Sequence, residues 1–171
     1  MAAAKPPRSL KARALAWLAQ REHSRLELQR KLLRAARAAE AGSGAGDGSS
    51  AGAPFDPDAA RRDIEALLDW LERHGFLAEQ RFVESRLHVR AARFGNVRIR
   101  QELAQHAVEL PEDARRALDE SEPARASAVR ARRFQQPPDT PQERARQGRF
   151  LAARGFSAEV IRRVLREASR G

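Results

Sequence analysis

Apolar and polar positions along the chain follow one pattern that occurs three times. Each occurrence has a pair of large side chains, a turn residue several positions later, and then two aliphatic residues four positions apart. Because residues four apart share one face of a helix, each occurrence predicts a helix, a tight turn and a second helix. The three sets are Trp17, Leu18, Ser24, Leu28 and Leu32; His88, Val89, Gly95, Ile99 and Leu103; and Phe150, Leu151, Ser157, Ile161 and Leu165.

A helical unit this short cannot bury its apolar stripe alone, so neighbouring units must pack on one another. The pattern therefore predicts an all-α fold, an elongated array of tandem three-helix repeats. The first repeat is expected at residues 8–77, the second at 78–121 and the third at 122–171, after a disordered tail at 1–7. Such an array is typical of an interaction protein rather than of an enzyme with a deep pocket.

Local signals predict where nine helices begin and end. Ser24, followed three residues later by Glu27, predicts a capping box at the start of a helix. Gly75 and Gly155 predict left-handed stops at the ends of two others. The expected helices include 8–22, 79–94, and a separate pair at 111–120 and 123–134.

Two segments between the helices have the composition of linkers. Residues 39–53 are almost entirely Ala, Gly and Ser, which predicts a flexible insert with a reach of roughly 20 Å. No Gly-Lys-Ser/Thr sequence follows this glycine-rich run, so it does not predict a phosphate-binding loop. Residues 135–141, QQPPDTP, predict a stiff proline-rich linker.

The amino-acid composition indicates what kind of partner and which cellular compartment to expect. The 171 residues carry a formal net charge of +10, which favours a polyanionic partner such as nucleic acid or an acidic protein surface. An alternative is that the arginine excess reflects compositional bias, since only three of the basic residues are lysine. The absence of cysteine is consistent with a reducing cytoplasm, and no apolar run is long enough to span a membrane.

The sequence offers no convincing catalytic or metal-binding set. The four histidines are scattered, and a metal site needs three or four converging ligands. Asp63, Asp69 and Glu72 could act as paired acid and base groups, but they lie opposite a leucine stripe, where a solvated helix face is expected. We therefore expect no catalytic residues, no metal and no cofactor.

Basic side chains gather around each of the three helix–turn–helix units, whereas the connecting helices are acidic. This alternation predicts a repeated basic surface for a partner, although solubility and internal ion pairing would also account for it. The candidate partner-binding residues are Arg21, Arg25, Arg30, Lys31, Arg93, Arg98, Arg100, Arg154, Arg162 and Arg163.

Four ordered motifs give the chain a family resemblance. They are ALAWLAQREHSRLELQRKL at 14–32, LERHGFL at 71–77 followed by RFVES at 81–85, FGNVRIRQEL at 94–103, and GRFLAARGFS at 148–157. With these motifs the sequence resembles the RecX family of RecA recombinase regulators, over nearly the whole chain.

The resemblance implies a monomeric, cytoplasmic, non-enzymatic protein that binds the filament of RecA on single-stranded DNA. It further implies inhibition of strand exchange and of coprotease activity. The alternative function is direct DNA or RNA binding through the basic helix–turn–helix units, since a short turn before an arginine-rich helix resembles a recognition unit.

Overall fold

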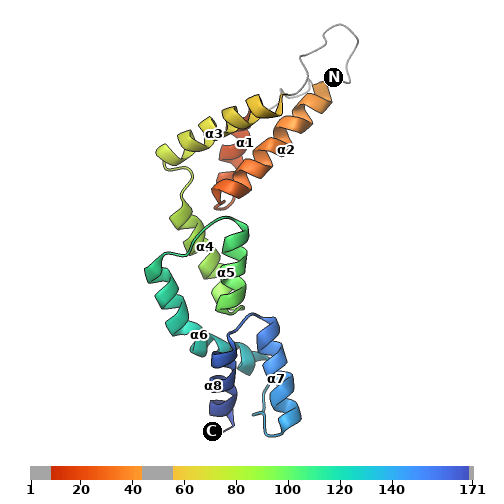
Figure 1. The fold of residues 1–171 in the computed structure, drawn as a ribbon, viewed down its shortest axis with the longest axis vertical. Helices are drawn as coiled ribbons and strands as arrows, with labels where there is room; N and C mark the ends of the chain where they lie inside the picture. The colour runs from red at the N-terminus through yellow and green to blue at the C-terminus, as the bar shows by residue number, and fades with distance from the viewer. Residues whose placement is uncertain (1–8, 44–55, 170–171) are drawn as a thin grey trace. The chain divides into compact units, whose positions relative to one another are not determined.

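The computed structural model describes residues 9–43 and 56–169, and the regular secondary structure in these ranges is helical. The predicted all-α class is confirmed. The chain divides into two compact units, Met1–Phe82 and Val83–Gly171 (Figure 1). The predicted tail at 1–7 lies outside the described residues, as do residues 44–53 of the predicted insert.

The first unit is a bundle of three helices, α1 (Leu10–Leu18), α2 (Arg25–Ser43) and α3 (Pro57–Arg73). Apolar side chains at helical spacing fill its centre, because each helix turns one stripe inward. The fully buried members are Ala14, Leu28, Leu32, Ile64, Leu68 and Leu71. Helix α2 continues through residues 39–43, which the sequence assigned to the flexible insert, so that part of the prediction was wrong.

The ends of these helices follow the predicted chemistry, with one correction. The Ser24 hydroxyl accepts the backbone N–H of Glu27 at 3.1 Å, and Gly75 adopts the left-handed conformation with φ of 71°. Helix α1 is shorter than the predicted 8–22. It ends at Leu18, and the chain then turns so that the carbonyl of Arg21 accepts a hydrogen bond from the buried His23 ring.

The second unit contains most of α4 (Glu79–Ala91) together with α5 (Asn96–Gln105), α6 (Glu112–Arg133), α7 (Pro141–Ala153) and α8 (Ala158–Ala168). Helices α6, α7 and α8 pack on one another. Their shared core consists of Ala126, Val129, Leu151, Phe156, Val164 and Leu165.

Helix α6 corrects the prediction of two separate helices at 111–120 and 123–134. It is one helix that continues through Pro123. A proline within a helix lacks an N–H and crowds the carbonyls of the preceding turn. Here the Leu118 carbonyl accepts hydrogen bonds from three side chains, Asn96, Ser121 and Arg125. These bonds stabilise the turn that precedes Pro123, and the helix continues through it.

The threefold pattern is recovered at its turn positions. Ser24, Gly95 and Ser157 each directly precede a helix, as the spacing predicted. Val89, one of the pair of large side chains in the second occurrence of the pattern, is 60% exposed. The boundaries of the three repeats and the elongation of the array stay predictions. In the described part of the chain, no helix is both long and apolar enough to cross a membrane.

Candidate interaction surface

Two glycine turns of the second unit dock directly against each other. The Gly95 N–H donates to the Arg154 carbonyl at 2.9 Å, and the Val97 N–H donates to the Gly155 carbonyl at 3.0 Å. A Cβ built on Gly95 would lie 2.2 Å from the Phe156 nitrogen. The α4–α5 and α7–α8 turns therefore meet through backbone atoms, and a side chain at this point would hold them apart.

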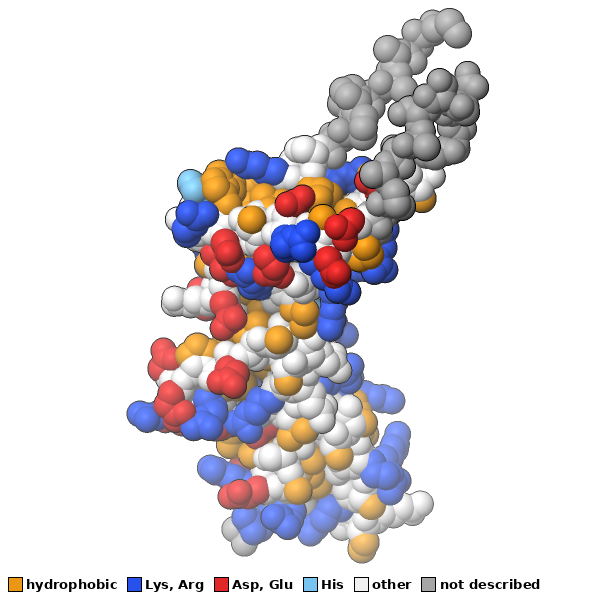
Figure 2. All heavy atoms as spheres, turned by 45° about the horizontal axis from the view of Figure 1, so that its top comes forward, with side chains coloured by type: hydrophobic (Ala, Val, Ile, Leu, Met, Phe, Trp, Pro, Cys, Tyr) orange, Lys and Arg blue, Asp and Glu red, His pale blue; other side chains and the backbone are white. Residues whose placement is uncertain are grey.

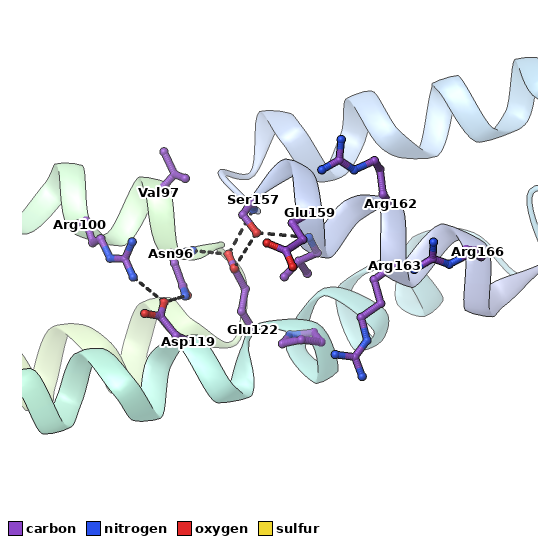
Figure 3. A pocket seen from close by; sticks show the side chains of 12 residues that line it. Asn96, Val97, Arg100, Asp119, Glu122, Ser157, Glu159, Arg162, Arg163 and Arg166 are labelled. Atoms are coloured by element: carbon purple, nitrogen blue, oxygen red, sulfur yellow. Dashed lines mark hydrogen bonds and ion pairs between the residues drawn. The ribbon is translucent and has the colours of Figure 1, made fainter.

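A buried carboxylate reinforces this junction. Glu122 of α6 is 4% exposed and accepts the backbone N–H of Asn96 at 2.8 Å and that of Ser157 at 3.3 Å (Figure 3). It also accepts the Ser157 hydroxyl at 3.0 Å. Free N–H groups and partial positive charge gather at helix N-termini. One carboxylate thus accepts a free backbone N–H at the N-terminus of both α5 and α8.

Arg125, one turn further along α6, satisfies the carbonyl side of the same junction. It donates to the carbonyl of Ala91, the last residue of α4, to that of Phe94 in the following turn, and to the Asn96 side-chain oxygen. Its guanidinium is therefore committed inside the fold. Together, Glu122 and Arg125 fix the segment that presents the surface arginines.

Around the docked turns, arginine side chains cover half-buried phenylalanine rings in a continuous series of contacts. Residues of this series come from the α4–α5 turn, α5, the end of α6 and α7. We call it the arginine–phenylalanine stripe, made of Arg93, Phe94, Arg98, Arg133, Phe134, Arg146, Phe150 and Arg154.

The first part of the stripe lies on the junction itself. The Arg98 guanidinium carbon is 4.3 Å from the centre of the Phe94 ring, and that of Arg93 is 5.8 Å away. Arg154 donates to the Arg93 carbonyl at 3.4 Å. Three predicted partner-binding arginines are thus brought together, although they come from segments far apart in sequence.

The second part continues across α7 to the end of α6. Arg154 lies 4.6 Å from the Phe150 ring, which meets Phe134 edge to face at 5.2 Å. Arg133 and Arg146 each lie 5.7 Å from the Phe134 ring. The sequence analysis missed both arginines, since only the fold brings their helices to one aromatic pair.

The stripe carries uncompensated positive charge. Of its five arginines, only Arg98 has a carboxylate within ion-pair distance in the described part of the chain, Glu102 at 3.5 Å. In Figure 2, blue and orange side chains lie along the right edge of the second unit, whereas red and blue side chains lie together on its left side. Rings hold the arginines in place while their charge faces solvent, an arrangement suited to a polyanion.

Arg100, Arg162 and Arg163 line a separate pocket of about 620 Å³, formed by α5, α6 and α8 (Figure 3). Arg100 pairs with Asp119, and Arg163 pairs with Glu167 on its own helix. Arg166 lines the same pocket. Arg100 and Arg163 are therefore less available than the stripe arginines, whereas Arg162 is exposed and has no carboxylate within ion-pair distance among the described residues.

In the first unit, Arg21 and Lys31 meet at a buried histidine. His23 is 1% exposed; its Nδ1 donates to the Arg21 carbonyl at 2.9 Å, and its Nε2 accepts from the Lys31 ammonium at 3.0 Å. Burial lowers the pKa of His23 and also that of Lys31. Arg21 is held by Glu27, which raises its pKa. The two bonds require a neutral ring.

The remaining two candidate partner-binding residues, Arg25 and Arg30, differ in whether their side chains are free to contact a partner. Arg25 bonds to three α3 carboxylates, Glu65 at 2.5 Å, Asp69 at 2.7 Å and Glu72 at 2.6 Å. Burial opposes charge on Arg25, but these carboxylates raise its pKa well above the ordinary value. Arg25 therefore ties α2 to α3. Arg30 is exposed on α2.

The neutral state of His23 predicts a pH dependence of stability. Since its folded pKa is lowered, the unfolded chain binds the proton more tightly, with a pKa near 6.5. We expect the free energy of unfolding to be maintained above about pH 7 and to fall as the pH drops below about 6.5. One proton contributes at most about 1.4 kcal/mol per pH unit. Urea unfolding between pH 5 and 8 measures this slope.

Two variants test whether His23 causes the pH dependence of the free energy of unfolding. His23→Gln should flatten it, because glutamine does not titrate there. His88→Gln, at an exposed position on α4, should leave the slope as in the parent protein. A parent slope that survives in His23→Gln would contradict the assignment.

These features define an all-helical interaction protein with basic surfaces. Within residues 9–43 and 56–169, no group of three or more His, Asp or Glu side chains is placed to hold a metal. A family model described as "RecX, third three-helix domain" matches residues 120–165, the region that contributes Glu122 and most of the stripe.

Relatives match almost the entire chain. The Regulatory protein RecX of Leptothrix cholodnii is 47% identical over 98% of this chain and 94% of its own length. That of Ralstonia nicotianae is 44% identical over 98% and 93%. A crystal structure of RecX from Lactobacillus salivarius has the same fold, with a TM-score of 0.67 and 17% identity over 95% of this chain and 96% of that one. The chain belongs to the RecX family of regulatory proteins.

Proposed function

We propose that the protein is a cytoplasmic, non-enzymatic regulator of RecA recombinase. It binds the filament that RecA forms on single-stranded DNA and inhibits strand exchange and coprotease activity. Membership in the RecX family supports the regulatory role. The observation that carries the proposal for this chain is the arginine–phenylalanine stripe, whose charge is largely unpaired and whose backbone is locked by docked turns.

The proposed mechanism is occupation of the filament surface through several modest contacts. Arg93, Arg98 and Arg154 provide one contact region in the second unit, and Arg21, Arg30 and Lys31 provide another in the first. Contacts carried by one chain add to each other through high effective concentration. The net charge of +10 speeds association with an acidic, phosphate-bearing filament. A bound regulator would then block access to the filament.

A direct test removes charge from the stripe without removing its bulk. In the triple variant Arg93→Gln, Arg146→Gln and Arg154→Gln, filament binding should weaken roughly 10- to 150-fold, if each guanidinium contributes about 0.5–1 kcal/mol. The measurement is co-sedimentation with RecA filaments on single-stranded DNA, with a strand-exchange assay alongside.

The matched control loses the same charge elsewhere. Arg37, Arg62 and Arg116 are exposed and lie outside the stripe, so their replacement by Gln should reduce binding much less. If both triple variants bind and inhibit equally well, the stripe is not the contact surface. If the parent protein neither binds filaments nor changes strand exchange, the regulator proposal fails.

Direct nucleic-acid binding stays the second candidate, because the stripe would also suit phosphates. A salt series separates the two. Binding to bare DNA through ~6–10 phosphate contacts should weaken by about 10³–10⁵ between 50 and 200 mM salt and should not require RecA. Tight binding to bare DNA that outcompetes the protein filament would favour this second function.

A further inference from the structure

One aromatic cluster of the first unit lies at the edge of its core and does not belong to the stripe. It lies where α3 ends and consists of Trp70, His74 and Phe76. In the described part of the chain, the large hydrophobic side chains that stand exposed are Phe76, Val89 and Val97, and Phe76, at 44%, is the aromatic one among them.

The three rings form a stack. The His74 ring lies 4.1 Å from that of Trp70 with 25° between the planes. The Phe76 ring lies 5.6 Å from that of Trp70 with 16° between them. Trp70 is half buried and packs against the core of the first unit. Trp70 therefore anchors the stack to the core, whereas the side chains of His74 and Phe76 are exposed to solvent.

The backbone beneath the stack is held rigidly. The Phe76 N–H donates to the Leu71 carbonyl and the Gly75 N–H donates to that of Glu72, which closes α3 with a Schellman turn. The His74 Nδ1 donates to the Trp70 carbonyl at 2.8 Å, which fixes the ring. Arg81 donates to the carbonyls of Gly75 and Phe76. Little side-chain freedom remains to be lost on binding.

Cations surround the stack. The Lys11 ammonium lies 3.5 Å from the centre of the Trp70 ring, and Arg73 is exposed on the last turn of α3. Arg81 pairs with Glu22 and lies at the turn itself. Neither Lys11 nor Arg73 has a carboxylate within ion-pair distance among the described residues. The acidic side chains Asp69 and Glu72 of the same helix bond to Arg25, which they share with Glu65.

We infer that this cluster is a stacking platform for an unpaired base of single-stranded nucleic acid, with the base on the exposed face of Phe76. Flat rings recognise bases without regard to sequence, and neighbouring cations hold the backbone phosphates. Lys11 and Arg73 are the phosphate contacts. Duplex DNA does not fit, because its bases are stacked on one another.

Binding of a fluorescent 12-nucleotide oligo-dT by anisotropy tests the platform. Phe76→Leu keeps an apolar side chain at the Schellman turn but removes the ring, and it should weaken binding about 5- to 100-fold. Phe76→Trp restores a flat ring and should bind at least as tightly as the parent. Val89→Ala, which removes another exposed apolar side chain, is the control and should bind like the parent.

The choice of oligonucleotide distinguishes stacking from charge attraction. An abasic strand of the same length keeps the phosphates and loses the bases. The parent should bind it as weakly as Phe76→Leu binds oligo-dT. Equal binding of the abasic strand and oligo-dT by the parent would overturn the inference. So would equal oligo-dT binding by the parent and Phe76→Leu.

A spectroscopic measurement places the base at this site. Trp17→Phe leaves Trp70 as the single tryptophan. Oligo-dT should then quench its emission, and the abasic strand should not. Emission that responds to RecA protein alone and not to oligo-dT would make the cluster a protein contact and exclude the platform.

The inference goes beyond the proposed function and is tested without recombinase. If oligo-dT fails to bind through the rings while the parent still inhibits strand exchange, only the platform is lost. If base stacking is observed and strand exchange is unaffected, only the regulator proposal is lost.

Discussion

Gly95→Ala should destabilise the second unit by more than about 3 kcal/mol, enough to unfold it in mild urea. The expected cause is steric. The new methyl group would lie 2.2 Å from the Phe156 nitrogen and 2.3 Å from the Gly155 carbonyl carbon and oxygen. Backbone atoms cannot rotate away as a side chain can. The φ of Gly95 is −81°, so conformational strain contributes nothing.

Two further glycines allow two contributions to the loss of stability to be separated. One is the steric clash between the docked turns, and the other is the strain of placing alanine at a positive φ. Gly75 and Gly155 both have positive φ, 71° and 80°. A Cβ on Gly75 meets nothing within 4 Å, whereas one on Gly155 lies 2.5 Å from the Arg98 Cβ. Gly75→Ala should cost only about 1–2 kcal/mol, and Gly155→Ala should cost clearly more.

Urea unfolding of these variants, followed by circular dichroism, supplies the comparison. Gly148→Ala is a useful reference, because its methyl group would make ordinary contact with Leu165 at 3.5 Å and alanine favours a helix. It should be neutral or slightly stabilising. If Gly95→Ala were equally harmless, the two turns would not be docked as described.

Glu122→Ala should cost about 3–5 kcal/mol. The variant leaves the N–H groups of Asn96 and Ser157 without their shared acceptor inside the fold, and each such buried group costs about 1–3 kcal/mol. It also removes one of the two carboxylates whose negative charge acts on Arg125, leaving Asp119. Together, these two losses should make the first turns of both α5 and α8 less stable.

Glu120→Ala on the same helix is the matched control, since Glu120 is exposed. It should change the free energy of unfolding by no more than about 0.5 kcal/mol. Glu122→Gln keeps one acceptor oxygen and should fall between the two. Hydrogen exchange at residues 96–100 and 157–161 should rise in Glu122→Ala. An unchanged exchange rate there would falsify the dual-capping role.

Much of the fold could be predicted from local chemistry. The leucines of α3 recur at helical spacing and are buried, and Ser24, Gly75 and Ser157 act at the helix ends where the sequence placed them. These features depend on residues within one turn of each other. The uninterrupted α6 could not be predicted in this way, because the side chain of Asn96, from another helix, helps to stabilise the turn before Pro123.

Only part of the candidate interaction surface could be predicted from the sequence. Arg93, Arg98 and Arg154 were chosen for their charge and lie together, but Arg25 is held by three carboxylates of α3. Glu122 carried a signal that was overlooked. It lies four residues from Leu118 and four from Ala126, within the apolar stripe of α6, where a carboxylate must find buried donors.

The sequence by itself determined the all-helical class, the caps at Ser24 and Ser157 and the positive charge, because helical periodicity and capping act over a few residues. Only the tertiary structure decided which arginines are free. Arg25, for example, pairs with Glu65, which lies 40 residues away in the sequence, and Arg154 bonds to the Arg93 carbonyl 61 residues away. Such distant partners follow from packing, which local spacing does not encode.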